Sequence, residues 1–332
     1  MAQQLTEAVA PDGFRHEALL YRGTDGFVEE VTAFVRDSLA ASDPVLVAVG
    51  RERTEQLRAA LDADLHGRGD DVLFADMAEL GRNPARIIPA WRDFLISHGA
   101  GRRVRGVGEP VWPERTSAEL LETQRHEVLL SIAFTDLDNF WLVCPYDLDA
   151  LAPEVIQEAY RSHAWISEGG VSAASDDHVP VSAVPAHLDH PLDAPPAHAP
   201  RRTFATGDLS DVRHEIDRWA AGQGMPAPRA DLLVLAVNEL TTNSVEHGGG
   251  RGELLLWRSG DSAVAEVRDG GYIAEPLIGR LRPDREQGGG RGIWLVNHVC
   301  DLVELRSSPA GTVARVHLRL SEGTRIPDGG AG

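Results

Sequence analysis

Lysine is missing from this sequence, in which all 32 Lys and Arg side chains are arginine. The absence of lysine excludes a Walker A phosphate loop, a lysine Schiff base and the strand lysine of the protein kinases. Base-composition bias is the simplest cause, and the exclusion holds whatever the cause.

Cysteine and long apolar runs are also scarce. The two cysteines, Cys144 and Cys300, stand far apart, so they give no disulfide framework and fit a reducing compartment. No apolar run approaches the roughly 20 residues of a membrane helix. The first residues lack the basic-then-apolar order of a signal peptide. We therefore expect a cytoplasmic protein with no membrane partner.

Basic residues are fewer than acidic ones, 32 against 51, which gives a formal net charge of −19. A negative field over the whole molecule opposes phosphate-rich surfaces, so direct nucleic-acid binding is not expected as the main role. The length of 332 residues suits two domains that each bury a core.

Short apolar strands alternate with amphipathic helices from residue 14 to residue 168. We expect strands at 45–49, 72–75, 104–108 and 140–144, and helices at 26–39, 51–61, 84–98, 117–131 and 153–166. This alternation predicts an α/β domain with a largely parallel sheet covered by helices on both faces. Ligands of such sheets lie beyond the carboxyl ends of the strands.

Unusual residues gather at those strand ends and at the borders of this half. They are His16, Glu109, Trp112, Cys144, Tyr146, Asp147 and His163. Together with the order of elements, they resemble the MEDS sensory domain. The resemblance implies a RecA-like fold without a working nucleotide site, and a pocket for a small molecule. Gly50–Thr54 stands where a P-loop would follow the first core strand, but it lacks the second glycine and the lysine.

Two readings of the histidines and the cysteine stay open. His16, Cys144 and His163 suit zinc or iron as ligands, or Cys144 is a buried packing residue and the histidines are hydrogen-bonded or exposed. Glu109 and Trp112 are either a pocket wall or loop anchors. The segment Arg125–Leu130 is expected to be ordinary helix surface.

Composition shifts to Ser, Ala, Pro, His and Asp over residues 169–202, which predicts an extended, mobile linker. A second domain is expected at 203–320, with tails at 1–13 and 321–332. Its helices are expected at 209–221, through 231–247 and from 293. Its strands are expected at 252–257, 263–267, 301–305 and 312–318. The order implies an α/β sandwich in which one mixed sheet carries helices on one face.

The longest of these helices carries polar residues at its end. Glu239, Asn243 and His247 are spaced by four, so one face of the helix holds all three, and Gly248–Gly250 then stops the helix. The preceding run 231–237 is almost wholly apolar, so these polar groups would be costly to bury unless something met them there.

Three further motifs follow in order: Asp269-Gly270-Gly271, the glycine-rich loop Gly288–Gly292 opening a helix, and Gly311-Thr312 before the last strand. Together with the Glu239 helix they resemble the GHKL (Bergerat-fold) ATPase domain. The resemblance implies ATP and Mg²⁺ as cofactors, with Asp269 bonded to the adenine amino group. The implied cofactor-binding residues are Asn243, His247, Asp269, Gly271, Gly288, Gly290, Arg291, Gly292 and Thr312.

The chemistry of these residues suits that assignment. Asn243 offers a carbonyl oxygen to Mg²⁺, and Glu239, one turn earlier, is the candidate catalytic base. The loop 288–292 presents backbone N–H groups to phosphates without needing a lysine. His247 either contacts phosphate or only caps the helix. Ile273 replaces the second glycine of the family's D-x-G-x-G, and residues 272–287 are expected to be a mobile lid.

Within that superfamily the chain looks most like the anti-sigma-factor serine kinases. That resemblance implies a sigma factor and a STAS-type anti-anti-sigma protein as partners, with the sensory domain regulating a serine/threonine kinase. A non-catalytic, ATP-gated sigma-binding module is the alternative. A histidine-kinase-like protein is less favoured, because a Pro-rich linker stands where the phosphoacceptor hairpin would be. A homodimer is left open.

Overall fold

The computed structural model describes residues 13–65, 72–99, 101–283 and 290–321. The chain divides into two compact units, Met1–Asp189 and His190–Gly332. Within the described ranges, no helix combines the length and the apolarity that a bilayer crossing requires.

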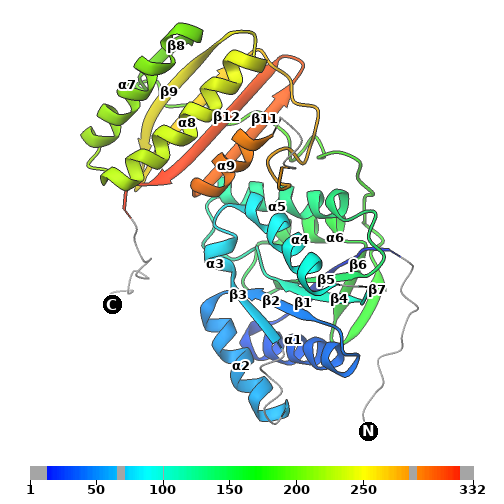
Figure 1. Cartoon of the computed structure of the whole chain (residues 1–332). Helices are drawn as coiled ribbons and strands as arrows, with labels where there is room; N and C mark the ends of the chain where they lie inside the picture. The colour runs from blue at the N-terminus through cyan, green and yellow to red at the C-terminus, as the bar shows by residue number, and fades with distance from the viewer. Residues whose placement is uncertain (1–12, 66–71, 100, 284–289, 322–332) are drawn as a thin grey trace. The chain divides into compact units, whose positions relative to one another are not determined.

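The first unit is built on a seven-stranded sheet (Figure 1). Its strand order is β3 (Val72–Asp76), β2 (Val45–Val49), β4 (Val104–Gly108), β5 (Phe140–Asp147), β1 (Arg15–Tyr21), β6 (Trp165–Glu168) and β7 (Val171–Ala174). All pairs are parallel except β6 with β7. The helices between the strands are α1 (Gly23–Ala40), α2 (Arg51–Leu65), α3 (Met77–Leu80), η2 (Pro84–Arg86), α4 (Ile87–His98), α5 (Ser117–Ala133) and α6 (Pro153–Ser162).

Helices cover both faces of this sheet, as the sequence predicts. Figure 1 shows α1 and α2 on one side and α4, α5 and α6 on the other. Leu19 and Val143 point to the first side, into a core shared with Phe27 of α1. On the second side Trp91 of α4 presses on the sheet, where a Cβ at Gly106 would lie 2.8 Å from its ring. The glycine at this position therefore admits the indole.

Several predicted elements differ from those observed. Strand β1 is not predicted from the sequence, although it lies between β5 and β6 and is buried along its whole length. The helix expected at 153–166 ends at Ser162, because the backbone at His163 turns extended and leads into β6. The strand expected to end at Cys144 runs to Asp147.

Helix α5 is more deeply buried than the sequence predicts. A capping box between Thr116 and Glu119 starts the helix. The stretch Arg125–Leu130, predicted as helix surface, is buried at all six positions. The prediction is wrong because α5 is enclosed around its whole circumference there, so no solvated face exists for its charged residues.

The described part of the second unit has a five-stranded sheet with α-helices on one face (Figure 1). Its strand order is β11 (Leu302–Ser308), β12 (Gly311–Arg319), β10 (Ser262–Asp269), β9 (Arg251–Ser259) and β8 (Arg201–Ala205). The other elements are η3 (Thr206–Asp208), α7 (Leu209–Gly222), α8 (Ala227–His247) and α9 (Arg291–Val299). Every strand pair is antiparallel, so the expected mixed sheet is wrong.

Alternation along β10 separates a core face from a charged face. Ala263, Ala265 and Val267 pack into the core formed with the helices, whereas Glu266 points to the other face and pairs with Arg315 at 2.6 Å. The carbonyl of Asp193 accepts from Arg315 at 2.5 Å. Part of the segment expected to be a linker therefore lies on the charged face of this sheet.

The start of that segment also has regular structure. Residues 171–174 form β7, and Leu188 is buried at 3% exposure in the first unit. The extended chain predicted for 169–202 is thus interrupted by segments that pack on each unit.

Candidate functional site

Helix α8 brings the polar residues of the second unit to one end of its sheet. The helix begins after Pro226, and its buried residues Leu233, Val237 and Leu240 anchor it in the core. Glu239 and Asn243 are half-buried, and His247, the last helical residue, is exposed. The core contacts thus fix the direction in which the polar edge points.

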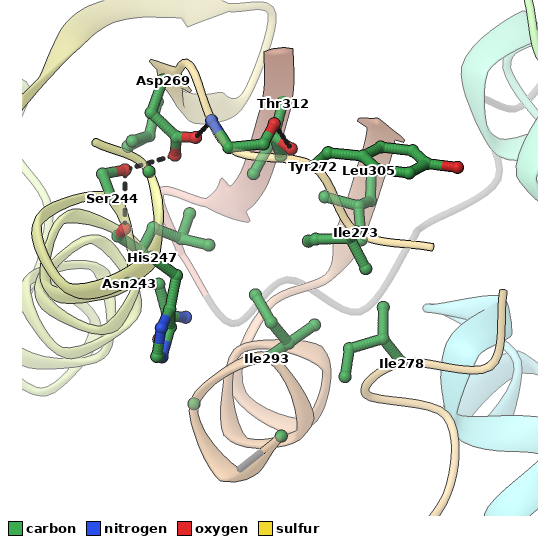
Figure 2. Close-up of a pocket in the computed structure, with 17 residues that line it drawn as sticks. Asn243, Ser244, His247, Asp269, Tyr272, Ile273, Ile278, Ile293, Leu305 and Thr312 are labelled. Atoms are coloured by element: carbon green, nitrogen blue, oxygen red, sulfur yellow. Dashed lines mark hydrogen bonds between the residues drawn. The ribbon is translucent and has the colours of Figure 1, made fainter. Parts of the chain in front are cut away.

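A cavity of about 290 Å³ opens beside this edge (Figure 2). Seven of the predicted cofactor-binding residues line it: Asn243, His247, Asp269, Gly271, Gly290, Gly292 and Thr312. Gly288, the eighth, lies outside the described residues. Arg291, the ninth, is exposed at the first position of α9 and does not line the cavity.

Asp269 is held by both of its carboxylate oxygens. Ser244 Oγ lies 2.6 Å from Asp269 Oδ2, and the backbone N–H of Gly271 donates to Oδ1 at 2.8 Å (Figure 2). The same Ser244 hydroxyl lies 3.0 Å from the carbonyl oxygen of Leu240. These contacts orient the carboxylate at the cavity wall and leave it further lone pairs for a ligand donor.

Two glycines allow the strand end to approach the helix end. A Cβ at Gly248 would lie 2.5 Å from Asp269 Cγ, and one at Gly271 would lie 3.0 Å from Asp269 Oδ1. Both distances are below ordinary carbon contact. The D-x-G motif and the glycine run after α8 therefore have a common physical reason, which is the close packing around Asp269.

Thr312 closes the polar side of the cavity. Its hydroxyl donates to the carbonyl of Gly271 at 2.9 Å, and Ser307 Oγ lies 2.7 Å from it. The same Ser307 hydroxyl accepts from the N–H of Ile273 at 2.8 Å. Ile273, where a glycine was expected from the family pattern, is fixed by this bond and lines the cavity.

The apolar side of the cavity comes from Ile273, Ile278 and Ile293, which face Ser244 and Asp269 across the space (Figure 2). Gly279 packs against Ile293, and its carbonyl accepts from Asn297 of α9 at 3.0 Å. The described part of the predicted lid, 272–283, is thus joined to α9. Residues 284–287 lie outside the described residues.

Glu239 of α8 is not among the cavity-lining residues, but its side chain lies beside the first turn of α9. A Cβ at Gly292 would lie 2.9 Å from Glu239 Oε2 and 3.2 Å from Asn243 Nδ2. Gly290 caps this helix with φ of 83°, a left-handed conformation that suits glycine. The glycines let the N-terminus of α9, a natural place for an anion, come close to both side chains.

The seven residues predicted for a sensory pocket do not form a single site. Strand alternation sends them to opposite faces of the sheet in the first unit. Glu109 and Asp147 lie on the side of α1 and α2, whereas His16, Cys144 and His163 meet on the other side. The ring of Trp112 packs against the guanidinium of Arg115, which lies 3.7 Å from it.

Glu109 and Asp147 belong to a charged group at the carboxyl ends of the strands. Tyr21 donates to Glu109 at 2.9 Å, and Arg53 Nε lies 3.1 Å from the same carboxylate. Arg53 also lies 3.9 Å from Asp147. Burial raises the pKa of Glu109 to about 7, against the opposing effects of Arg53 and Tyr21.

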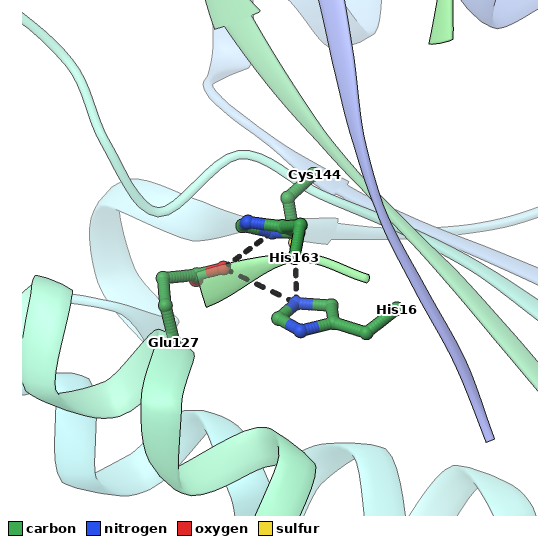
Figure 3. A group of neighbouring side chains, drawn as sticks. All are labelled: His16, Glu127, Cys144 and His163. Carbon is green, nitrogen blue, oxygen red and sulfur yellow. Dashed lines mark hydrogen bonds and ion pairs between the residues drawn. The ribbon is translucent and has the colours of Figure 1, made fainter. Parts of the chain in front are cut away.

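His16, Cys144 and His163 converge on a residue that the sequence prediction missed, Glu127 of α5 (Figure 3). All four side chains are buried. Burial, and then the neighbouring His163, lower the pKa of His16 to about 4, which leaves its imidazole neutral at neutral pH. Tyr146 lies beside this cluster, with its ring edge-on to His163 at 5.6 Å.

Comparison with known proteins divides the chain in the same way. Residues 15–164 match the family model of the methanogen/methylotroph, DcmR sensory domain (MEDS), and residues 203–318 match that of the histidine kinase-like ATPase domain. The chain carries a MEDS domain followed by a histidine kinase-like ATPase domain. No curated protein matches it.

One similar solved structure contains the RsbU and RsbW domains of Rv1364c from Mycobacterium tuberculosis. It is 20% identical, with a TM-score of 0.29, over 38% of this chain and 34% of that chain. The matched region thus spans about a third of that chain's length.

Three residues of these sites were missed in the sequence prediction. Ser244 follows Asn243 directly, but its contact with Asp269 arises from the packing of α8 on the sheet, which helical periodicity alone does not reveal. Tyr21 and Glu127 gave no local signal, since one ends an unpredicted strand and the other lies in a helix predicted to have a solvated face.

Proposed function

We propose that the ATPase domain binds ATP with Mg²⁺ and phosphorylates a serine or threonine of a STAS-type anti-anti-sigma protein. In this proposal, nucleotide binding also changes the affinity of the ATPase domain for a sigma factor. The observation that carries the proposal is the approach of Glu239 and Asn243 to Gly292, at the start of α9 and next to the cavity. The motif resemblance to anti-sigma serine kinases supports the choice of partner.

The residues around the cavity fit an adenine nucleotide. Asp269 keeps lone pairs for an exocyclic amino group while Ser244 and Gly271 fix its orientation. Isoleucine side chains offer apolar contact to a planar base. The volume of about 290 Å³ is close to the roughly 300 Å³ at the lower end of small-molecule pockets.

The residues next to the cavity fit the phosphate end. Bound ATP supplies the phosphoryl group, and Mg²⁺ offsets the phosphate charge. Asn243 presents an amide whose oxygen suits Mg²⁺, and the N-terminus of α9 attracts negative charge. Glu239 has the position to accept the proton of an attacking hydroxyl. His247 lines the cavity with a side chain that is 75% exposed, and helix capping is the role we propose for it.

The alternative is a sigma-binding module gated by ATP without phosphoryl transfer. Retention of Glu239 argues against this alternative, because nucleotide binding alone depends on Asp269, Asn243 and the glycines rather than on a base. A histidine-kinase-like role is less favoured still. A histidine kinase carries its acceptor histidine on a helical hairpin before the ATPase domain, whereas His214 lies inside that domain, exposed on α7.

Labelled ATP and a panel of STAS-domain proteins test the proposal. We expect the wild-type chain to label a partner, and Glu239→Gln to lose transfer by about 100-fold or more, the usual effect of removing a general base. Its ATP affinity should stay within about threefold. The matched control is Glu246→Gln, an exposed glutamate at the end of the same helix, which should transfer at the wild-type rate.

If the wild type binds ATP but labels no STAS protein, the ATP-gated binding module replaces the kinase. If Glu239→Gln transfers at the wild-type rate, the role given to Glu239 is wrong. We further propose that a small ligand of the MEDS domain biases the ATPase domain. A MEDS ligand that left both the transfer rate and the sigma-factor affinity unchanged would exclude that coupling.

A further inference from the structure

Four potential ligand atoms meet inside the MEDS domain, from β1, α5, β5 and the residue after α6 (Figure 3). His16 Nε2 lies 3.5 Å from Cys144 Sγ and 3.3 Å from Glu127 Oε2. His163 Nε2 lies 3.1 Å from the same oxygen. The four ligand atoms all lie within 4.8 Å of one another.

The hydrogen bonds of His163 leave one of its nitrogens turned toward this cluster. Its Nδ1 lies 2.9 Å from the carbonyl oxygen of Ala159, which can only accept, so Nδ1 carries a proton. In the neutral ring Nε2 is then a bare lone pair, 3.1 Å from a carboxylate oxygen. Two acceptors so close repel each other unless a proton or a cation lies between them.

The same arrangement is the usual outer shell of a metal-bound histidine, in which the second ring nitrogen donates to a backbone carbonyl. Within the described residues, neither Glu127 oxygen nor His163 Nε2 has a hydrogen bond of acceptable geometry. His163 Nε2 and Glu127 Oε2 are both buried and lie 3.1 Å apart, so two facing lone pairs would be costly there.

The printed distances between the ligand atoms are close to those around a tetrahedral cation. Bonds of about 2.0–2.3 Å to nitrogen, oxygen and sulfur place neighbouring ligands roughly 3.3–3.8 Å apart. Two of the contacts above, at 3.3 and 3.5 Å, lie in this range, the third is slightly shorter at 3.1 Å, and all pairs of ligand atoms lie within 4.8 Å. Two imidazoles, a thiolate and a carboxylate form a donor set for zinc-like divalent cations.

We propose that His16, Glu127, Cys144 and His163 bind one divalent transition-metal cation, Zn²⁺ or Fe²⁺, in a closed four-ligand site of the MEDS domain. With four protein ligands and no open position, such a site is structural rather than catalytic. It joins two neighbouring strands to α5 and to the end of α6. The site is separate from the Tyr21–Glu109 group, which lies on the other face of the sheet.

The rival explanation needs no metal. A proton on His163 Nε2 would pair it with Glu127, and the thiol of Cys144 would donate to His16. Both explanations predict a buried cluster, but only one predicts a stoichiometric metal ion. The proposal rests on the MEDS domain alone and is independent of the kinase activity.

Metal content decides between them. We express the full chain in medium supplemented with zinc or with iron, purify it under reducing, oxygen-free conditions and measure metals by mass spectrometry. About one Zn²⁺ or Fe²⁺ per chain is expected. Cys144→Ser should hold less than about a tenth of that amount, because a hydroxyl is a poor ligand for these ions. The matched control Cys300→Ser removes the other buried cysteine, which lies in the ATPase domain, and should keep the metal.

Cobalt provides a second readout that does not depend on the stability of a variant. Wild-type chain expressed in cobalt-supplemented medium should show a thiolate-to-cobalt absorption band. The triple variant His187→Ala/His190→Ala/His198→Ala, which lacks three histidines of the predicted linker, should keep the band. Wild-type chain without stoichiometric zinc, iron or cobalt would overturn the proposal. So would metal that stays in Cys144→Ser, or metal that is lost in the triple variant.

Discussion

The substitution Asp269→Asn tests the proposed nucleotide site most sharply, because we expect it to change binding without disturbing the fold. An asparagine can keep both contacts of the aspartate. Its Oδ1 accepts from the N–H of Gly271, and its Nδ2 donates to Ser244 Oγ. That hydroxyl then turns its own proton to the carbonyl of Leu240, 3.0 Å away. We expect the melting temperature to change little.

Binding should change because a neutral amide oxygen replaces a carboxylate. Hydrogen bonds to charged groups contribute about 1.5–3 kcal/mol and neutral ones about 0.5–1.5 kcal/mol. The difference of about 1–2 kcal/mol corresponds to roughly 5–30-fold weaker ATP binding. Guanine presents an acceptor where adenine presents an amino group, so the variant should also lose part of its preference for ATP over GTP.

Isothermal titration calorimetry with ATP and with GTP, at one Mg²⁺ concentration, measures both effects. The reasoning is refuted if Asp269→Asn keeps the wild-type affinity for ATP and the wild-type ratio between the two nucleotides. A large loss of melting temperature would instead show that the exchange of hydrogen bonds at Ser244 is wrong.

Two further predictions concern packing and charge. Gly248→Ala places a Cβ 2.5 Å from Asp269 Cγ, so ATP binding should fall by about tenfold or more; Gly222→Ala, with open space around its Cβ, is the control in the same titration. In the MEDS domain, burial raises the pKa of Glu109 from 4.5 to about 7. Protonation therefore contributes stability that is complete below about pH 4.5 and is lost as the pH rises through about 7, roughly 3 kcal/mol in all. Urea unfolding at pH 5 and pH 8 should show this loss in the wild type and not in Glu109→Gln.

Local periodicity and motif spacing predict most of the helices and strands, and seven of the nine positions that the family resemblance implies for nucleotide binding line the cavity. Each single helix, strand or motif depends on residues near one another in sequence. The buried cluster is different, because Glu127 meets His16 only through the pairing of β1 with β5 and the packing of α5. Sequence periodicity also does not reveal that α5 is enclosed on every side at Arg125–Leu130, where it predicts a solvated face.

In the ATPase domain, the residues proposed to bind the nucleotide and the proposed catalytic base occupy different positions. Asp269 and three isoleucines, Ile273, Ile278 and Ile293, line the cavity. Glu239 of α8 lies outside it, beside the first turn of α9. A base that also held the nucleotide could not be removed without loss of binding. Here Glu239→Gln and Asp269→Asn change different groups, so we expect phosphoryl transfer and nucleotide affinity to respond independently. If both variants lost ATP binding equally, Glu239 would be part of the binding site, and the case for a catalytic base rather than an ATP-gated module would fail.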